Sequence, residues 1–237
     1  MPLGQDINEN KLIEKFGEEN WWFSRKKQMV LDAVEGDRIL DLGCGPGLIG
    51  IELLKQNKKV VFLDRDSNAL ENIKRKYKDA LTICSDAIGI RFTNAFDTCI
   101  CTHLLEHIDD DVKLLKKING ALKSSGLLIL DVPAIKLLYG PHDRELGHIR
   151  RYSKVDLEGK LKLSGFIIEE SKYWNFISLF PKLLFRLLNK SGTQTNWFLT
   201  ETKINSILKK ILLFESHFPI GIGCNLFIKA RKITKND

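Results

Sequence analysis

Short apolar runs alternate with amphipathic stretches through the first half of this 237-residue chain. The apolar runs are nearly continuous, which is typical of strands buried on both faces of a parallel sheet. Stretches with helical spacing follow most of them, and parallel strands need such crossovers. A doubly wound α/β sheet is therefore predicted. Its strands are expected at residues 38–42, 59–63, 81–84, 96–101 and 127–132, and its helices at 48–55, 68–78 and 111–122.

The second half of the chain has a looser pattern. Residues 134–152 lack clear periodicity and form a long loop or insertion. Helical spacing then returns at 156–163, 175–189 and 201–214, with a strand pattern at 166–170. Residues 222–230 close the chain as an apolar strand, which we expect to be added at an edge of the sheet.

A glycine-rich segment, Asp41-Leu42-Gly43-Cys44-Gly45-Pro46-Gly47, joins the first predicted strand to the first predicted helix. Glycines let the backbone approach a ligand where a Cβ would collide, although a tight turn alone could use the same residues. Asp64 ends the next strand, where a carboxylate can accept hydrogen bonds from ribose hydroxyls. Asp66 competes for that role or caps the following helix. The third glycine comes one residue too early for a dinucleotide fingerprint, so the segment predicts another nucleotide-like cofactor.

This segment, together with later ones in the same order, resembles the class I S-adenosylmethionine-dependent methyltransferases. Residues 39–47 are similar to motif I of that family, and the resemblance covers residues 39–132 well. Residues 123–126 depart from it, because they replace the usual proline and paired glycines before the fifth strand. The other matching features are Asp64, Ser85-Asp86 after the third strand, Phe96-Asp97, residues 104–108 and residues 122–130.

The resemblance implies an enzyme with S-adenosylmethionine as cofactor and S-adenosylhomocysteine as product. It implies a Rossmann-like, mostly parallel seven-stranded sheet with an antiparallel C-terminal edge strand and helical additions. One domain is expected, with an N-terminal helical and aromatic lid (1–36), a cofactor core (37–133), a substrate region (134–165) and C-terminal strands with a helical insertion (166–237). The cofactor residues would be Asp41, Gly43, Cys44, Gly45, Gly47, Asp64, Arg65, Asp86, Ala87 and His103.

The methyl acceptor is expected beyond the carboxyl ends of the strands, near residues 134–152. His148 and His142 are candidate bases and Asp143 a candidate orienting partner, although such a histidine could instead pin the loop to the core. Arg150 and Arg151 could grip an anionic acceptor group, with one of them forming an internal ion pair. Tyr139 and Tyr152 are further candidate acceptor contacts. The stretch 147–153 resembles a subgroup of small-molecule methyltransferases.

Trp21 and Trp22 precede the first strand and also resemble the N-terminal segment of that subgroup. They could cover the cofactor and acceptor as a lid, or pack the first helix on the sheet.

The net charge of +7 is unevenly distributed. Residues 172–237 contain 11 Lys or Arg and 3 Asp or Glu, a balance of +8, which leaves −1 for the rest. Residues 176–190 combine this basic character with apolar residues at helical spacing, so they could contact a membrane surface or simply cover the sheet. The N-terminus lacks the pattern of a secretory signal, and a cytoplasmic protein with possible membrane association is expected. The five cysteines lack metal-ligand spacing, so no metal site is predicted.

The favoured function is methyl transfer to a small-molecule acceptor, on an oxygen of a lipid-, quinone- or saccharide-linked compound. RNA methylation using the basic C-terminal face is an alternative. Against nucleic acid, the fourth strand leads into Thr102-His103-Leu104 and not into the Pro-Pro segment of amino-group methylases, and the chain has no Pro-Cys pair for cytosine C5 chemistry. A nicotinamide-dependent dehydrogenase and a non-catalytic relative that binds cofactor also remain open. The oligomeric state is not predicted.

Overall fold

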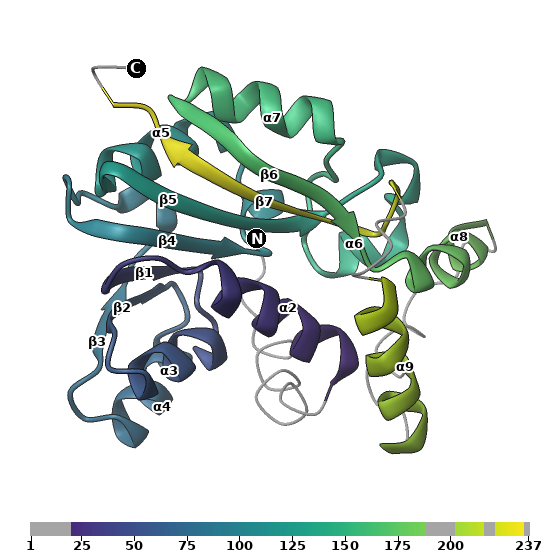
Figure 1. Ribbon diagram of the computed structural model, residues 1–237, viewed down its shortest axis with the longest axis horizontal. Coiled ribbons are helices and arrows are strands. Elements are labelled where there is room, and N and C mark those ends of the chain that lie inside the picture. The colour runs from purple at the N-terminus through teal and green to yellow at the C-terminus, as the bar shows by residue number, and fades with distance from the viewer. Residues whose placement is uncertain (1–19, 188–201, 216–220, 235–237) are drawn as a thin grey trace.

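The computed structural model describes residues 20–187, 202–215 and 221–234. In this part of the chain a seven-stranded sheet runs in the order β3-β2-β1-β4-β5-β7-β6 (Figure 1). Strands β1 to β5 pair in parallel, as the apolar runs predicted. The strands are β1 (Arg38–Leu42), β2 (Lys59–Asp64), β3 (Leu81–Cys84), β4 (Phe96–Thr102), β5 (Leu122–Pro133), β6 (Phe166–Trp174) and β7 (Asn225–Lys232).

The last strand, β7, is antiparallel to its neighbours, but the prediction that it forms the edge was wrong. It lies between β5 and β6, and β6 forms the edge. Residues 225–228 of β7 are all buried, whereas most of β6 is at least partly exposed. A strand with continuous apolar character buries both faces, so the interior position suits β7 better than the edge.

Helices cover both faces of the sheet, because successive residues of a strand point to opposite sides. Ile39 of β1 belongs to one core with α2 (Trp21–Ala33), α3 (Leu48–Lys55) and α4 (Ser67–Lys76). Leu40 belongs to the other core, with α5 (Asp111–Ala121) and α7 (Lys154–Leu163). Side-chain caps fix where several helices begin: Asn20 accepts hydrogen bonds from the first turn of α2, and Asp66 does so for α4.

The strand order reverses between β1 and β4, and this position determines where a ligand can bind. The carboxyl ends of both strands open at the same edge of the sheet, and the connections from them run to opposite faces. Such a switch point forms a crevice in open α/β sheets. The glycine segment follows β1 and His103 follows β4, so the chain brings both to this crevice.

The region predicted as a helix over 175–189 is divided in the structure. Residues Phe176–Ser178 form a 3-10 turn after Asn175, which has a left-handed backbone, and α8 follows over Leu179–Leu187. Residues 188 and 189 lie outside the described part of the chain. Helix α9 spans Thr202–Glu215, close to the predicted 201–214. Within the described residues, no helix is long and apolar enough to cross a membrane.

Candidate functional site

The glycine segment after β1, residues 43–47 and here called the cofactor loop, has a backbone that only glycine tolerates well. Gly43 and Gly47 have φ angles of 69° and 71°, in the left-handed region. A Cβ on Gly47 would lie 2.6 Å from Cδ1 of Ile73, and one on Gly43 would lie 3.0 Å from the Leu104 side chain. The glycines therefore allow the loop to pack closely against α4 and against the end of β4.

Every backbone N–H of the cofactor loop is used inside the protein. The amides of Gly43 and Cys44 both donate to the carbonyl of Leu63, at 2.8 and 3.2 Å. The amide of Gly47 donates to the Cys44 carbonyl, and that of Gly45 to Oδ2 of Asp64 at 2.7 Å. Pro46 has no N–H. Binding of a pyrophosphate by such a loop depends on backbone amides that point at the ligand, so this loop does not suit a dinucleotide.

Two carboxylates flank the cofactor loop. Asp41 is buried and accepts a hydrogen bond from the amide of Gly50 at 3.1 Å. Burial, with a smaller contribution from the charge of Asp64, raises the pKa of Asp41 to about 7. Asp64 is half-buried at the end of β2, where its Oδ1 accepts from the amide of Asp66 at 2.9 Å. An ionised carboxylate has about four acceptor positions, so Asp64 can bind ribose hydroxyls while it holds the loop.

The third predicted cofactor acid, Asp86, is exposed after β3. Its Oδ1 accepts from the amide of Ile88 at 2.8 Å and caps the short turn Ala87–Gly89. Ala87, the first residue of that turn, is buried, and Arg65 is exposed after Asp64. Asp86 thus has a local structural role at the position where the family resemblance implies a contact with adenine.

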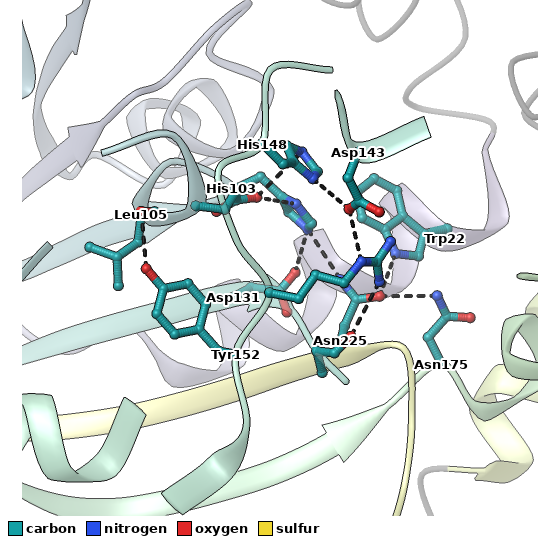
Figure 2. A network of polar contacts seen from close by, with 12 residues as sticks. Trp22, His103, Leu105, Asp131, Asp143, His148, Tyr152, Asn175 and Asn225 are labelled. Carbon is teal, nitrogen blue, oxygen red and sulfur yellow. Dashed lines mark hydrogen bonds and ion pairs between the residues drawn. The ribbon is translucent and has the colours of Figure 1, made fainter. Parts of the chain in front are cut away.

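His103 lies at the centre of a buried polar cluster (Figure 2). Its Nδ1 is 3.0 Å from Oε1 of Glu106, and its Nε2 is 3.1 Å from Oδ2 of Asp131. Both carboxylates are fully buried. Burial and the Lys26 ammonium act to lower the pKa of His103, but the hydrogen bonds to Asp131 and Glu106 outweigh them and raise it. A protonated His103 would neutralise one of these two buried charges.

Aromatic and amide groups surround the cluster. The ring of Trp22 contacts the His103 ring edge-on, with centroids 5.1 Å apart, and stacks on Trp174. The indole of Trp174 donates to Oδ1 of Asp131 at 2.8 Å. Asn225 of β7 bonds both His103 and Asn175. The C-terminal strand therefore helps to build a site that the sequence placed mainly in the first half of the chain.

The segment over residues 134–152, predicted as a loop, contains a 3-10 turn (Lys136–Leu138) and the short helix α6 (Pro141–Glu145). This segment, here called the acceptor loop, holds His148 against the cluster. Nδ1 of His148 is 2.9 Å from Oδ1 of Asp143, and its Nε2 is 3.9 Å from Oε1 of Glu106. Asp143 also accepts from the Arg151 guanidinium at 2.8 Å and from the amide of Gly140. Burial acts to raise the pKa of Asp143, but His148 and Arg151 lower it to about 2, so the carboxylate is charged.

Comparisons with known proteins indicate a methyltransferase. A family model described as a methyltransferase domain matches residues 40–130. A Mycolicibacterium smegmatis protein described as a probable S-adenosylmethionine-dependent methyltransferase is 22% identical over 179 residues, which cover 72% of this chain and 69% of that protein. The chain belongs to the class I S-adenosylmethionine-dependent methyltransferases.

Two further similarities concern the methyltransferase. A ubiquinone biosynthesis O-methyltransferase from Coxiella burnetii is 25% identical over 154 residues, and the match covers 54% of this chain and 63% of that protein. The crystal structure of an S-adenosylmethionine-dependent methyltransferase from Mesorhizobium loti has a TM-score of 0.63 at 16% identity, over 88% of this chain and 96% of that one. At that identity the structural likeness shows the fold, and it confirms the mixed, mostly parallel sheet.

The cofactor loop of the methyltransferase fits S-adenosylmethionine better than a dinucleotide. This cofactor has no phosphate, so a loop whose amides are all used internally loses no binding group. Asp64 at the end of β2 suits the ribose, and Asp41 lies buried beneath the loop. When bound, the cofactor supplies an activated methyl group on a sulfonium.

Several predicted acceptor contacts of the methyltransferase have other roles in the structure. Tyr152 is fully buried, and its hydroxyl donates to Asp111 and to the Leu105 carbonyl, so it packs in the core and cannot contact an acceptor. Arg150 pairs with Asp111 at 2.8 Å, and Arg151 with Asp143. Both arginines are therefore engaged, where the sequence predicted this for one. A buried aspartate available to each explains the difference.

The remaining candidate residues of the acceptor site have different surroundings in the structure. Tyr139 is half-buried and donates to the His148 carbonyl at 3.0 Å, so it positions the acceptor loop. Trp21 is buried in the core, which favours packing over a lid for this residue, whereas Trp22 reaches His103. Burial and the charge of Lys182 lower the pKa of His142 to about 4, so its ring is neutral and weakly basic near pH 7.

Sequence reasoning missed the residues that connect His103 to the acceptor loop and to the sheet. Glu106 contacts both His103 and His148, and its Oε2 is buried with no hydrogen-bond partner. Atoms of Glu106, His107 and His148 that could bind a metal lie within 4.8 Å of one another, a grouping that the sequence spacing does not reveal. Asp131 could have been found, because a charged residue inside the apolar run 127–132 needs a buried partner.

Proposed function

We propose that this methyltransferase transfers the methyl group to an oxygen atom of a small-molecule acceptor that is lipid-, quinone- or saccharide-linked. We propose further that His148 accepts the proton of the acceptor hydroxyl. The observation that carries the proposal is the pairing of His148 with Asp143.

Asp143 is well placed to set the tautomer of His148. A charged Asp143 beside Nδ1 favours the form in which Nδ1 carries the proton, and Nε2 is then the basic nitrogen. Tyr139 holds the backbone of His148, and Arg151 and Gly140 hold Asp143. A base fixed in this way loses little entropy when it meets a substrate.

The proton transfer follows from this arrangement. As the acceptor oxygen forms its new bond to carbon, its proton passes to Nε2 of His148. The imidazolium that results lies between the carboxylates of Asp143 and Glu106, which stabilise its charge. The carbon–sulfur bond breaks with its electron pair going to sulfur, so the products are a methyl ether and a neutral thioether. General-base catalysis of this kind contributes about 10²- to 10⁴-fold to a rate.

The nature of the acceptor has weaker support than the proton transfer. The name of the Coxiella burnetii relative describes an O-methyltransferase of ubiquinone biosynthesis, which favours an oxygen on a hydrophobic molecule. The polar cluster beside Trp22 and Trp174 offers both aromatic surface and hydrogen-bonding groups. A lipid- or quinone-linked acceptor resides at a bilayer, so the proposal includes peripheral membrane contact through residues 176–190, of which 188–190 lie outside the described part of the chain.

The test follows a labelled methyl group from S-adenosylmethionine into fractionated cell extract. With the wild-type chain, label is expected in the lipid-soluble or saccharide fraction as a base-stable ether. The His148→Asn variant should reduce the initial rate by about 10²- to 10⁴-fold. His142→Asn is the matched control and should retain most of the rate, because the ring of His142 is a weak base.

Two results would contradict the proposal. Label in RNA but not in the small-molecule fractions would favour nucleic-acid methylation. A His148→Asn variant as active as the wild type would remove His148 as the base while leaving the methyltransferase assignment in place.

A further inference from the structure

Helix α8 has an unusual orientation for a helix on a protein surface. Phe180 and Leu187 have 75% and 73% of their surface exposed, and Leu184 is exposed as well. Their spacing of four and three residues places them on one side of the helix. Lys182 is half-buried instead, near Asp143 and Arg151, and burial lowers its pKa. The helix thus exposes three large apolar side chains while one charged side chain, that of Lys182, is half-buried, although a surface helix usually places its apolar side chains inward.

Helix α9 repeats part of this pattern. Ile207 and Ile211, four residues apart, are both exposed, while Leu212 is buried in the core. Lys209 and Lys210 are exposed between them. Figure 1 shows α8 and α9 at the same end of the molecule. We call the exposed residues Phe180, Leu184, Leu187, Ile207 and Ile211 the apolar face.

Exposed basic side chains lie on both helices, with Lys209 and Lys210 on α9. In the sequence, residues 172–215 contain seven Lys or Arg and two acidic residues, Glu201 and Glu215, although the chain up to residue 171 is close to neutral. Arg186 of α8 is exposed beside Leu187. A surface that combines large apolar side chains with basic ones matches the interface of a bilayer with anionic headgroups. Nucleic acid would match the charge but would leave the apolar side chains in water.

Both helices are attached to the walls of the candidate site. The amide of Trp21 donates to Oδ1 of Asn205 in α9 at 2.7 Å, next to Trp22. Arg186 of α8 packs on Gly140, where an added Cβ would lie 2.8 Å from its Cδ. The amide of Gly140 in turn bonds Asp143. A surface that engages α8 and α9 would therefore lie close to the acceptor loop and to α2.

We propose that the apolar face docks on the surface of a bilayer that contains anionic lipid, with Lys209, Lys210 and Arg186 at the headgroups. The inference deepens the proposed function, since it names the surface at which a lipid-linked acceptor would be met. Vesicle binding alone tests the docking inference, so this inference can fail while methyl transfer to a small molecule stands. Methyl transfer to a small molecule can likewise fail while vesicle binding stands.

The experiment is co-sedimentation of the full chain with vesicles of phosphatidylcholine, alone or mixed with phosphatidylglycerol. The wild-type chain is expected to bind the mixed vesicles more tightly than the neutral ones. The double variant Phe180→Ser, Leu187→Ser should weaken the partition coefficient by at least about tenfold on both compositions. The double variant Lys209→Glu, Lys210→Glu should abolish the preference for anionic vesicles and its dependence on salt.

The matched control removes apolar surface of similar exposure elsewhere. Val155 and Leu163 on α7 are 83% and 75% exposed, and α7 covers the opposite face of the sheet from α9. The double variant Val155→Ser, Leu163→Ser should bind vesicles like the wild type. Circular dichroism of each variant verifies that it is folded.

Four outcomes would overturn the proposal. The wild-type chain could fail to bind either vesicle, or the control variant could lose as much binding as the α8 variant. Light scattering could show a dimer that the α8 variant dissociates, in which case a second copy covers the apolar face. Tighter binding to RNA than to mixed vesicles would assign the basic residues to nucleic acid.

Discussion

The cofactor loop and the acceptor loop lie at the same edge of the sheet but are held in place by different interactions. Backbone amides and glycine conformations hold the cofactor loop, with contacts to Leu63 and Asp64 of the neighbouring strand. Buried charged side chains hold the acceptor loop, through Asp143, Arg151 and His148. Local backbone geometry leaves a signature in the sequence, whereas a network of buried charges depends on residues far apart in the chain.

The largest expected effect tests whether buried charge holds the acceptor loop. Arg151→Met leaves the Asp143 carboxylate buried and without its guanidinium, which should lower the free energy of unfolding by about 3–5 kcal/mol. The control is Arg150→Met, whose partner Asp111 keeps Lys160 and whose pair is partly exposed. Its loss should be about 1 kcal/mol or less. Urea unfolding at pH 7 measures both, and equal losses would refute the distinction.

The next effect concerns Asp41 beneath the cofactor loop. Its pKa is raised from 3.8 to about 7, so the folded state keeps a proton that the unfolded state loses between these values. The stability of the wild-type chain should therefore fall as pH rises from about 4 to 7. Asp41→Asn keeps an acceptor for the Gly50 amide and removes this loss, so the variant should be more stable at pH 8 by about 2–4 kcal/mol.

Unfolding of both chains at pH 4 and pH 8 provides the measurement. The difference between wild type and Asp41→Asn should largely disappear at pH 4. A variant that is less stable than the wild type at pH 8 would show that Asp41 is charged and well paired in the fold.

A smaller effect distinguishes Asp64, the last residue of β2, from Asp66, two residues later. Asp64→Asn should weaken S-adenosylmethionine binding by about 10- to 100-fold, because a hydrogen bond to a charged group contributes about 1.5–3 kcal/mol. Asp66→Asn is the control, since asparagine caps α4 as well as aspartate does. Calorimetric titration should show no change for it. If Asp66→Asn has the larger effect, the ribose acid has been assigned to the wrong residue.

The smallest effect concerns Trp22, which faces the polar cluster. Trp22→Leu loses aromatic contacts worth about 0.5–1.5 kcal/mol, so the acceptor KM should rise by about 2- to 10-fold. Phe92→Leu removes a comparable edge-on pair with Phe96, away from the site, and should leave KM unchanged. Equal changes in the two variants would mean that Trp22 acts only through stability.

The sequence predicted the cofactor half of the fold closely for physical reasons. Strands buried on both faces give continuous apolar runs, and the turn at Gly43 and Gly47 requires glycine. The position of β7 was missed, because strand order depends on pairing between residues about 100 apart, such as Ile129 and Lys229. The same applies to the acceptor loop: His148 and Asp143 were identified, but the contacts of Glu106 and Asp131 with His103 were not, since only the fold brings these three residues together.

The claim that the two loops have separate tasks can be tested by titrating S-adenosylhomocysteine into the His148→Asn variant. Glu106 bridges His148 to His103, which is a predicted cofactor residue. Removing His148 would therefore disturb the cofactor site if the tasks of the two loops were linked. We expect a dissociation constant within about twofold of the wild-type value, together with the loss of methyl transfer. A variant that no longer binds S-adenosylhomocysteine would contradict it, because His148 would then be needed to organise the cofactor site.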